Sequence, residues 1–489
     1  MTKASSITNH HSLITIHYSQ ITIHYSPFTN PKKLYLCRFK SSTMNVKITK
    51  GLDLKIDGGA TDTMLDFALP ELFHIRPDDF RWLTPKLLVQ PDDRVQIGTP
   101  LFADKKDERI VMVSPVAGSV KEIVRGEKRV IEEITIVRNC ETALETLVDF
   151  DDPTDGESTR KLLLQYGLWP CLRQRPYSVI PNPDISPKSV FIPCFDSNPL
   201  APDFNVLMRG KEGYFGLGVK MLRLAAENAP IHLCMRKDAE NELFENVENV
   251  QKHYFSGPHP AGNVGTHIHH IDPIGKRDTV WFIDPQEVAR IGQFFAEHKL
   301  QFGKTAALTG PVVKSTGYFN TIYGADLSAL FADNLTADNT RIISGSILSG
   351  RKLKSSPTLA FHDRQITVIA EGGKREFIGW LLPGLKKWSL SHTFLAWLTP
   401  KRTYAVNTSL QGGRRAFMMT DVYDKVFPFD LMPLQLLKAC EIKDLEQMEA
   451  LGIYEVDSED FALCELVCPS KKECQKIVED AIFELRTQN

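Results

Sequence analysis

The sequence predicts a multidomain α/β protein, with a small β-sandwich, an α/β domain built on a mainly parallel sheet, further β-rich segments and a helical C-terminal region. A chain of 489 residues is too long for one hydrophobic core and suggests about three or four domains. Short β-type runs separated by glycine and proline fill residues 87–137, whereas strands alternate with helices over residues 151–298. This change of pattern indicates two successive domains.

The composition excludes several classes of protein. The formal net charge is −2, whereas proteins that bind nucleic-acid backbones usually carry a marked basic excess. The longest apolar stretch, Phe377–Leu398, is interrupted by Pro383, two lysines and His392, which a membrane-spanning helix would not normally carry. The nine cysteines are an odd number spread thinly along the chain, unlike a secreted disulfide framework. We therefore expect a cytoplasmic protein, soluble or peripheral to a membrane, with no transmembrane segment and no nucleic-acid partner.

Residues 1–43 are predicted to be an extension outside the folded core. They contain no Asp or Glu and repeat the motif Ile14–Ser19 at Ile21–Ser26. An organelle leader is disfavoured because no arginine precedes Arg38, and secretion because there is no uninterrupted apolar stretch. We interpret the extension as the product of a start codon assigned too far upstream of Met44, with a disordered arm as the alternative.

Residues 44–140 are predicted to form a barrel-sandwich-like N-terminal domain. Val95–Phe102 and Ile110–Val124 contain strands of about four to seven residues, punctuated by turn-forming glycine and proline. The arrangement resembles the barrel-sandwich of biotinyl and lipoyl carriers, which present a modified lysine on an exposed hairpin. Lys105 and Lys106 are the nearby lysines, but they lack the flanking pattern of the carriers. We therefore expect this domain to be structural.

Residues 150–300 are predicted to form a Rossmann-like α/β domain, because strands that alternate with helices favour a parallel sheet. The expected helices are Thr159–Tyr166, Val219–Asn228 and Val288–His298, and the expected strands are Ser189–Cys194 and Ile231–Cys234.

Three further parts complete the chain. Residues 301–356 resemble a soluble-ligand-binding β-grasp module, also found in the flavin-carrying subunit of respiratory complex I, and residues 357–430 are β-rich, with Ile366–Ala370 as the clearest strand. Residues 431–489 are predicted to be helical, with Asp430 as the cap of the first helix and Pro433 in its first turn. The expected buried stripe of that helix comprises Leu434, Leu437, Ile442 and Leu445.

Two segments are weak candidates for nucleotide-binding loops. Tyr166–Ser178 stands where a flavin phosphate would need a glycine-rich loop, but it has one glycine among bulky residues. Its Arg173 and Arg175 are expected to be exposed, either solvated or at a subunit contact. Gly210–Lys220 is rich in glycine, yet its spacing fits neither a dinucleotide fingerprint nor a P-loop. We expect this loop to end one element and cap the next, and we expect no cofactor bound by this chain.

Cysteines and histidines give only weak metal candidates. Cys464, Cys468 and Cys474 have spacings of four and six, wider than iron–sulfur runs and unlike zinc couplets, so structural thiols are favoured. His267 and His269 would face the same way on a strand, but a full site needs a third ligand. We expect buried or capping histidines and no metal site.

Four motifs together resemble one known family. They are Phe255–His267, Leu308–Val313, Arg341–Gly350 and Ile378–Gly384, and the resemblance extends from about Met44 to the C-terminus. The segment Met44–Leu54 also resembles the N-terminus of that family. The family consists of the A-subunits of the Na+-translocating NADH:quinone oxidoreductase, a bacterial respiratory sodium pump.

The resemblance implies a peripheral subunit on the cytoplasmic face of the bacterial inner membrane, in a six-subunit translocase that oxidises NADH, reduces ubiquinone and exports Na+. It implies five partner subunits, with the membrane-embedded B-subunit the most direct contact. It places NADH, flavins and the iron–sulfur centre in the partner subunits, and associates this subunit with the second, quinone-reducing step. The isolated subunit is then expected not to be catalytic.

A quinone needs a mostly apolar slot with one or two polar groups for its carbonyl oxygens. Tyr254, Phe255, His259 and His267 combine aromatic faces with hydrogen-bonding groups beside a constrained backbone, and we take them as candidate quinone contacts. The alternative is that the motif only shapes a domain or subunit interface.

Two other classes of function stay open. One is a soluble, cofactor-bearing NADH dehydrogenase subunit related to complex I, which would purify coloured and oxidise NADH unaided. The other is a non-catalytic subunit of the related complex that uses ferredoxin, whose counterpart should display the iron–sulfur cysteine runs that this sequence lacks.

Overall fold

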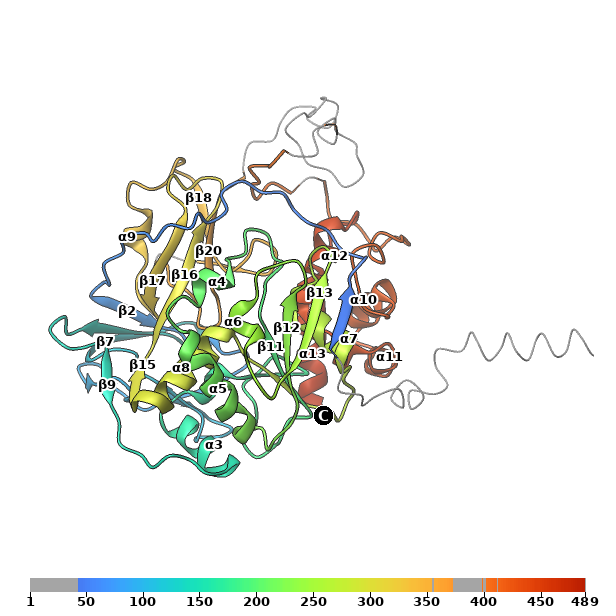
Figure 1. Cartoon of the computed structure of the whole chain (residues 1–489). Coiled ribbons are helices and arrows are strands. Elements are labelled where there is room, and N and C mark those ends of the chain that lie inside the picture. The colour runs from blue at the N-terminus through green and yellow to red at the C-terminus, as the bar shows by residue number, and fades with distance from the viewer. Residues whose placement is uncertain (1–42, 354–355, 373–397, 399–401, 411, 489) are drawn as a thin grey trace, which may run out of the picture. The chain divides into compact units, whose positions relative to one another are not determined.

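The computed structural model describes residues 43–353, 356–372, 398, 402–410 and 412–488 (Figure 1). The extension up to residue 42, the motif Ile378–Gly384 and the apolar stretch Phe377–Leu398, except for Leu398, lie outside the described residues. No helix within the described ranges is long and apolar enough to cross a membrane.

The N-terminal domain is built from two small antiparallel sheets. One sheet has the order β2-β8-β7-β4 and the other the order β3-β5-β6. The strands are β2 (Leu72–Ile75), β3 (Pro85–Leu87), β4 (Arg94–Val95), β5 (Pro100–Asp104), β6 (Val111–Val113), β7 (Gly118–Arg125) and β8 (Ile131–Arg138). Both sheets contribute buried side chains to one hydrophobic cluster, among them Phe102 from β5 and Ile134 from β8. The predicted β-sandwich is confirmed, and Lys105 and Lys106 lie in the exposed turn between β5 and β6.

The α/β domain contains a six-stranded sheet of order β1-β13-β12-β11-β14-β10. Only β10 runs antiparallel to its neighbour, so the predicted parallel character is confirmed. The strands are β1 (Met44–Lys47), β10 (Arg173–Arg175), β11 (Val190–Pro193), β12 (Ile231–Arg236), β13 (Gln251–Ser256) and β14 (Val280–Phe282). From the sequence, β1 is assigned to the β-sandwich; in the structure it pairs instead with β13, from Met44 opposite His253 to Lys47 opposite Ser256.

Six helices of the described part of the chain accompany this sheet. They are α3 (Gly156–Gln165), α4 (Phe204–Leu207), α5 (Glu212–Ala225), α6 (Glu242–Glu245), α7 (Val264–Ile271) and α8 (Pro285–Glu297). The helices α3 and α8 begin about one turn before their predicted starts, because capping residues lie further upstream. The Asp155 side chain accepts from Ser158 N, and the Asp284 side chain accepts from Gln286 N with Pro285 in the first turn.

The sequence predicts a loop at the glycine-rich segment Gly210–Lys220. In the structure, most of this segment lies within α5 instead. Figure 1 shows α5 beside α8, and glycines make this approach close. A Cβ atom on Gly218 would lie 1.9 Å from the carbonyl oxygen of Val288, and one on Gly292 would lie 1.9 Å from that of Tyr214. The glycines therefore serve helix packing, which overrides their low helix propensity.

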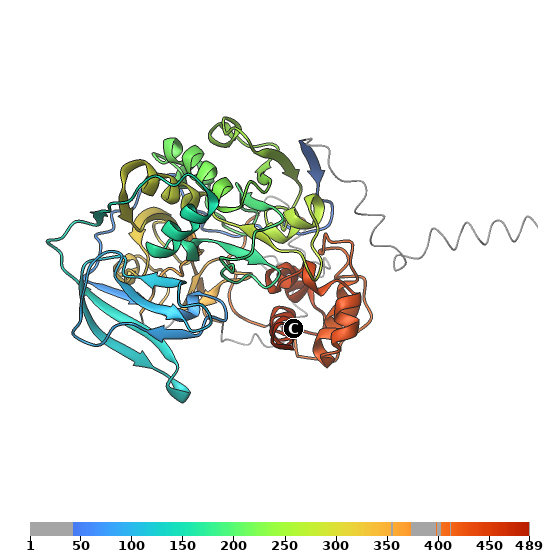
Figure 2. The same cartoon turned by 90° about the horizontal axis from the view of Figure 1, so that it is seen from below.

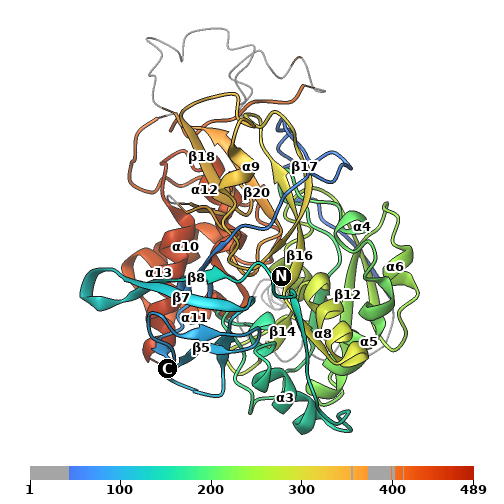
Figure 3. The same ribbon diagram turned by 90° about the vertical axis from the view of Figure 1, so that its left-hand side faces the viewer.

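The third domain is a five-stranded sheet of order β17-β16-β20-β18-β19, with α9 (Ser328–Phe331) beside it in Figure 3. Its strands are β16 (Gly303–Thr309), β17 (Gly317–Ile322), β18 (Thr340–Ser344), β19 (Arg351–Lys352) and β20 (Gln365–Ala370). The strand predicted at Ile366–Ala370 is present, but it completes this sheet by lying between β16 and β18. A separate pair of strands, β9 (Glu145–Leu147) and β15 (Lys299–Gln301), joins the ends of the α/β domain.

The C-terminal region is helical, as predicted, and forms its own hydrophobic cluster (red in Figure 2). Its helices are α10 (Pro433–Ile442), α11 (Leu445–Ala450), α12 (Ala462–Val467) and α13 (Cys474–Gln488). The predicted cap at Asp430 is wrong, because α10 begins at Pro433 with Met432 as its N-cap residue. The predicted stripe is also wrong at Ile442, which is 71% exposed where the chain turns through Lys443 in a left-handed conformation, and at Leu445, which lies on α11.

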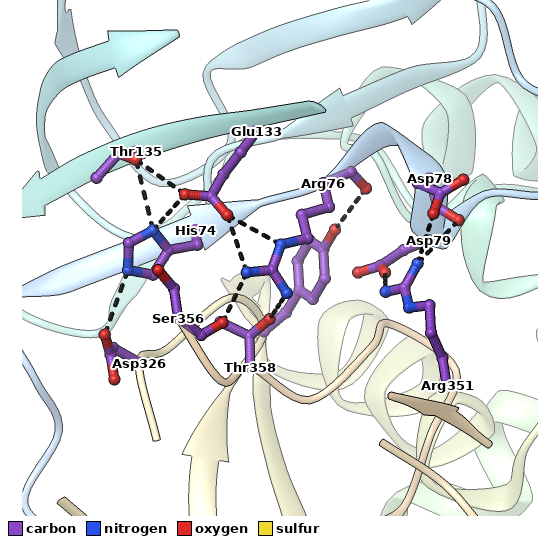
Figure 4. A network of polar contacts seen from close by, with 11 residues as sticks. His74, Arg76, Asp78, Asp79, Glu133, Thr135, Asp326, Arg351, Ser356 and Thr358 are labelled. Carbon is purple, nitrogen blue, oxygen red and sulfur yellow. Dashed lines mark hydrogen bonds and ion pairs between the residues drawn. The ribbon is translucent and has the colours of Figure 1, made fainter. Parts of the chain in front are cut away.

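A network of polar contacts joins the N-terminal domain to the third domain (Figure 4). Arg76 donates to Glu133 within its own domain, and to Thr358 Oγ1 and Ser356 O in the third. His74 lies between Glu133, at 2.8 Å, and Asp326, at 3.4 Å. Close by, Arg351 pairs with Asp78 and Asp79.

Candidate functional site

The motif Phe255–His267 follows β13 and is shaped by backbone contacts with the segment after β1. Gly257 has a φ of 115°, and a Cβ there would lie 2.1 Å from the carbonyl oxygen of Ile48. A Cβ on Gly51 would lie 2.2 Å from the carbonyl oxygen of His259. Two approaches of backbone to backbone therefore require glycine. The peptide bond between His259 and Pro260 is cis.

His259 is 2% exposed and fixes the loop against the end of β11. Its Nδ1 lies 3.1 Å from Ser197 Oγ, which accepts from Gly262 N at 2.7 Å. The main-chain N–H of His259 donates to Asp53. Burial lowers the pKa of His259 to about 4, so the ring is neutral at physiological pH.

His267 lies on α7 and not on a strand, which corrects the geometry supposed for a metal pair with His269. Residues two apart on a helix point to different sides. His267 Nε2 lies 2.9 Å from the carbonyl oxygen of Ala261, which can only accept, so Nε2 carries the proton. Nδ1 is then an acceptor, and it has no partner among the described residues. Burial lowers the pKa of His267 to about 3, and its ring centroid lies 4.4 Å from that of Phe255.

The four candidate quinone contacts do not form one cluster. Phe255 of β13 contacts His267 of α7, and His259 lies in the loop between these two elements. Tyr254 points to the opposite side of the sheet from Phe255, because successive residues of a strand alternate, and its hydroxyl donates to Glu245 at 2.7 Å. This hydrogen bond raises the pKa of Tyr254 to about 12.

The other histidines of this region are held by contacts within the protein, and His269 Nε2 also accepts from Asp430 N. His269 Nδ1 lies 2.7 Å from Glu455, and His270 Nδ1 lies 2.9 Å from the carbonyl oxygen of Thr266. His253 contacts His232 of β12, at 3.0 Å between ring nitrogens. His232 is too far away in sequence to be connected with this group from spacing alone. Across the described ranges, no three His, Cys, Asp or Glu side chains are placed to hold a metal ion.

The carboxyl ends of β11 and β14 are bridged by a side chain of the third domain. Parallel sheets bind ligands where the strand order reverses, and here β12 lies on one side of β11 and β14 on the other. Asp196 follows β11 and Asp284 follows β14, and Arg364 donates to the first at 2.7 Å and to the second at 2.5 Å. Burial opposes ionisation of both carboxyls, but Arg364 holds the pKa of each below its usual range. The guanidinium thus lies at the edge of the sheet where parallel sheets generally bind their ligands.

The two arginines expected to be exposed are not exposed. Arg175 is 1% exposed and pairs with Glu459 at 2.5 Å and Asp460 at 3.3 Å. Arg173 stacks on Phe282, with 4.4 Å from its guanidinium carbon to the ring centroid. Because carboxylates of the C-terminal region already bind Arg175, its guanidinium is not free for a phosphate.

The three C-terminal cysteines are buried around Tyr423. Cys464 lies on α12, Cys468 follows that helix and Cys474 opens α13. Cys468 Sγ lies 3.0 Å from the hydroxyl of Tyr423 and accepts from Lys472 N. A hydrogen bond from Cys474 lowers the pKa of Cys468 to about 5, whereas burial raises the pKa of Cys464.

Comparison with known proteins gives a consistent family. Residues 46–139 match the NqrA N-terminal barrel-sandwich hybrid domain, residues 154–300 the NqrA second alpha/beta domain, and residues 305–355 the NQRA C-terminal domain. The A-subunit of the Na(+)-translocating NADH-quinone reductase of Haemophilus influenzae (strain PittGG) is 36% identical over 454 residues, which cover 91% of this chain and 100% of that protein.

Proteins of the same name from other organisms are equally similar. That of Rhodopirellula baltica is 36% identical over 450 residues, or 90% of this chain and 98% of that protein. That of Neisseria meningitidis serogroup C is 36% identical over 432 residues, or 88% of this chain and 96% of that protein. A solved NAD+-reducing [NiFe]-hydrogenase covers 69% of this chain and 64% of its own, but at 11% identity and a TM-score of 0.36 it supports no statement about this fold.

Proposed function

This chain belongs to the NqrA family, the A-subunits of the Na+-translocating NADH-quinone reductase, and from that membership we propose that it is a peripheral subunit, on the cytoplasmic face of the bacterial inner membrane, of a respiratory sodium pump. The pump couples NADH oxidation and ubiquinone reduction to Na+ export. The chain contributes to its second step, from ubisemiquinone to ubiquinol, and is not catalytic alone. Its partners are the five other subunits, most directly the membrane-embedded B-subunit, and these carry the NADH site, the flavins and the iron–sulfur centre.

The observation that carries this proposal is the match of relatives along about nine tenths of the chain, with three family domains in the same order. The bridge from Arg364 to Asp196 and Asp284 supports a subunit without a nucleotide of its own in the crevice of the parallel sheet. A complex I-like NADH dehydrogenase would need that crevice, or a comparable glycine-rich loop, to be open to phosphate.

Ubiquinone is proposed as a ligand at Phe255, His259 and His267. The unpartnered Nδ1 of His267 is an acceptor that a quinol hydroxyl would satisfy and a quinone carbonyl would not, because a carbonyl also only accepts. The site therefore favours the reduced product of the second step. The alternative is that the motif has only a structural role and shapes the loop after β13.

The finer description of the fold belongs to the same proposal. We assign residues 44–140, 150–300, 301–356, 357–430 and 431–489 as successive parts, with the second Rossmann-like and the third of β-grasp type. The parallel strand order of the second part and the mixed sheet of the third support these assignments. Two strands cross these bounds: β1, from the first part, pairs with β13 of the second, and β20, from the fourth part, pairs with β16 of the third.

The test is to tag the full chain in its native host, solubilise the membranes gently and purify it. Co-purification of five other polypeptides with Na+-stimulated NADH:quinone reduction is the expected result. A single coloured polypeptide that oxidises NADH unaided would overturn the proposal.

A further inference from the structure

A cleft of about 510 Å³ opens on the C-terminal region, away from the motif Phe255–His267. It lies between the segment around Arg415, the end of α10 and the start of α13 with the residues before it. Ala416 and Ile477 are its apolar lining residues, and the remaining side chains around it are charged. The charged side chains that line this cleft need water or a binding partner to solvate them.

The acidic side chains in the cleft are already neutralised. Each one pairs with a cation of the same cleft, and the pairs are Lys472 with Glu441, Arg414 with Glu473 and Lys476 with Asp480. These exposed pairs contribute little to stability, but they cancel the negative charge of the lining.

Two cations remain. The main-chain N–H of Arg415 donates to Ser470 O at 2.9 Å, which fixes its position, while its guanidinium pairs with no carboxylate in the part of the chain that the structure describes. Lys471 likewise has no acidic partner within those ranges, and its side chain runs past Gly412. The cleft therefore carries an excess of positive charge and attracts an anion.

Exposed apolar side chains continue from the cleft. Met418 is 48% exposed, Met419 is 74% exposed and Ile442, at the end of α10, is 71% exposed. Lys472 lies over the Phe417 ring at 4.9 Å, and Lys438 of α10 donates to Met419 Sδ at 3.3 Å, so the segment 417–419 follows α10 away from the cleft. Cations beside exposed apolar side chains are typical of surfaces that bind a lipid interface.

We propose that Arg415 and Lys471, with Met418, Met419 and Ile442, form a docking surface for anionic phospholipid headgroups. A guanidinium binds a phosphate with two parallel hydrogen bonds, an ammonium adds a second positive charge, and the methionines reach the boundary between headgroups and acyl chains. The inference rests on the proposed function in one respect: a subunit of a membrane complex works beside such a surface.

The test uses the full chain and vesicles of phosphatidylcholine with or without phosphatidylglycerol, in a sedimentation assay at about 0.1 M salt. Wild type is expected to bind only vesicles with phosphatidylglycerol, and less as salt rises. Arg415→Glu with Lys471→Glu is expected to lower the partition coefficient roughly thirty-fold or more, since each basic residue near an anionic surface is worth a factor of about five. Met418→Ser with Met419→Ser is expected to weaken binding and leave its salt dependence unchanged.

The matched control reverses Lys220 and Lys237, which are exposed in the α/β domain and give the same change in net charge. It is expected to bind within about twofold of wild type, since the effect of a charge falls off within a Debye length of about 10 Å. Equal loss in the control, or equal binding to neutral vesicles, would overturn the proposal. So would a cleft variant that binds vesicles like wild type and loses partner polypeptides instead, because the cleft would then dock a protein. Vesicle binding does not depend on co-purification, so the two proposals can fail separately.

Discussion

Arg175 and Asp460 form an ion pair at 3.3 Å, with side chains 1% and 0% exposed, between the edge strand of the α/β sheet and the C-terminal region. Burial raises the pKa of Asp460 above its usual range although Arg175 lies against it, because a buried carboxylate loses its hydration.

Arg175→Leu is expected to destabilise the protein by about 3–5 kcal/mol, because it leaves buried carboxylates without their cation. Urea unfolding followed by circular dichroism measures this change. Arg209→Leu is the control, since Arg209 and Asp62 pair at the surface with 60% and 64% exposure. The control is expected to lose less than about 1 kcal/mol. Equal losses in the two variants would show that the buried pair has no special weight.

The crossing of α5 and α8 depends on Gly218. Gly218→Ala is expected to lower the melting temperature, because its Cβ would overlap the carbonyl oxygen of Val288 and push the helices apart. Gly216→Ala lies in the same helix with nothing within 4 Å of the added atom. It is expected to stabilise the helix by roughly 0.5–1 kcal/mol, from propensity alone. Melting curves that move in the same direction for both variants would contradict this explanation of the glycines.

The substitution His267→Gln tests the roles of the two ring nitrogens separately. A glutamine amide can still donate to the carbonyl oxygen of Ala261, but it removes the acceptor at Nδ1. We expect the affinity for a short-chain ubiquinol to fall about fivefold, the value of one hydrogen bond, with little change for the quinone. Titration followed by tryptophan fluorescence measures both constants.

The control for that variant is His270→Gln on the same helix, where Nδ1 already contacts the carbonyl oxygen of Thr266. Unchanged ubiquinol affinity in His267→Gln, or equal loss in His270→Gln, would remove His267 from the proposed site and leave the motif a purely structural role.

Stability at acid pH is expected to depend on Glu133. Burial alone would raise its pKa, but hydrogen bonds from His74 and Arg76 outweigh that effect and lower the pKa from 4.5 to about 2 (Figure 4). A lowered folded-state pKa contributes stability that is complete above pH 4.5 and is lost as the pH falls toward 2. In Glu133→Gln the urea midpoint should therefore be lower than in wild type at pH 7, and the gap should narrow between pH 4.5 and 2.

Glu108→Gln is the control for that pH series, because Glu108 pairs with Lys86 at the surface, with 61% and 44% exposure. As the pH falls, the urea midpoint of Glu108→Gln should change in the same way as that of wild type. A gap between Glu133→Gln and wild type that stays constant with pH would mean that Glu133 acts by packing and not by charge.

Local signals predicted much of the fold. The alternation of strands and helices indicated the parallel sheet, and the glycine and proline spacing indicated the two small sheets before residue 140. The errors arose where contacts with a segment far away in sequence determine the local structure. The glycines of Gly210–Lys220 suggest a loop, because their role in packing α5 against α8 is not visible in the local sequence. The strand β1 is adjacent in sequence to the β-sandwich, but its pairing partner is β13 of the α/β domain.

The candidate site was predicted less completely, for the same reason. The constrained motif was correctly singled out as a fixed backbone path, since Gly257 and Gly51 are required by contacts with other segments. Strand alternation separates Tyr254 from Phe255 and was available from the sequence once β13 was assigned. Ser197, Arg364 and Asp460 were out of reach, because nothing in local sequence connects them with the residues that they contact.

The Arg364 bridge also imposes an order on biosynthesis. Arg364 is made 80 residues after Asp284 and 168 residues after Asp196, so a ribosome needs roughly 4–16 s after Asp284 to supply the cation that both carboxylates require. Until then, the two carboxylates at the carboxyl edge of the parallel sheet lack their ion-pair partner and are held only by water and by hydrogen bonds from Asn198 and Gln286. We therefore expect the second domain to reach its final packing only after Arg364 has emerged, and a fragment that stops near residue 300 to lack this ion-pair partner.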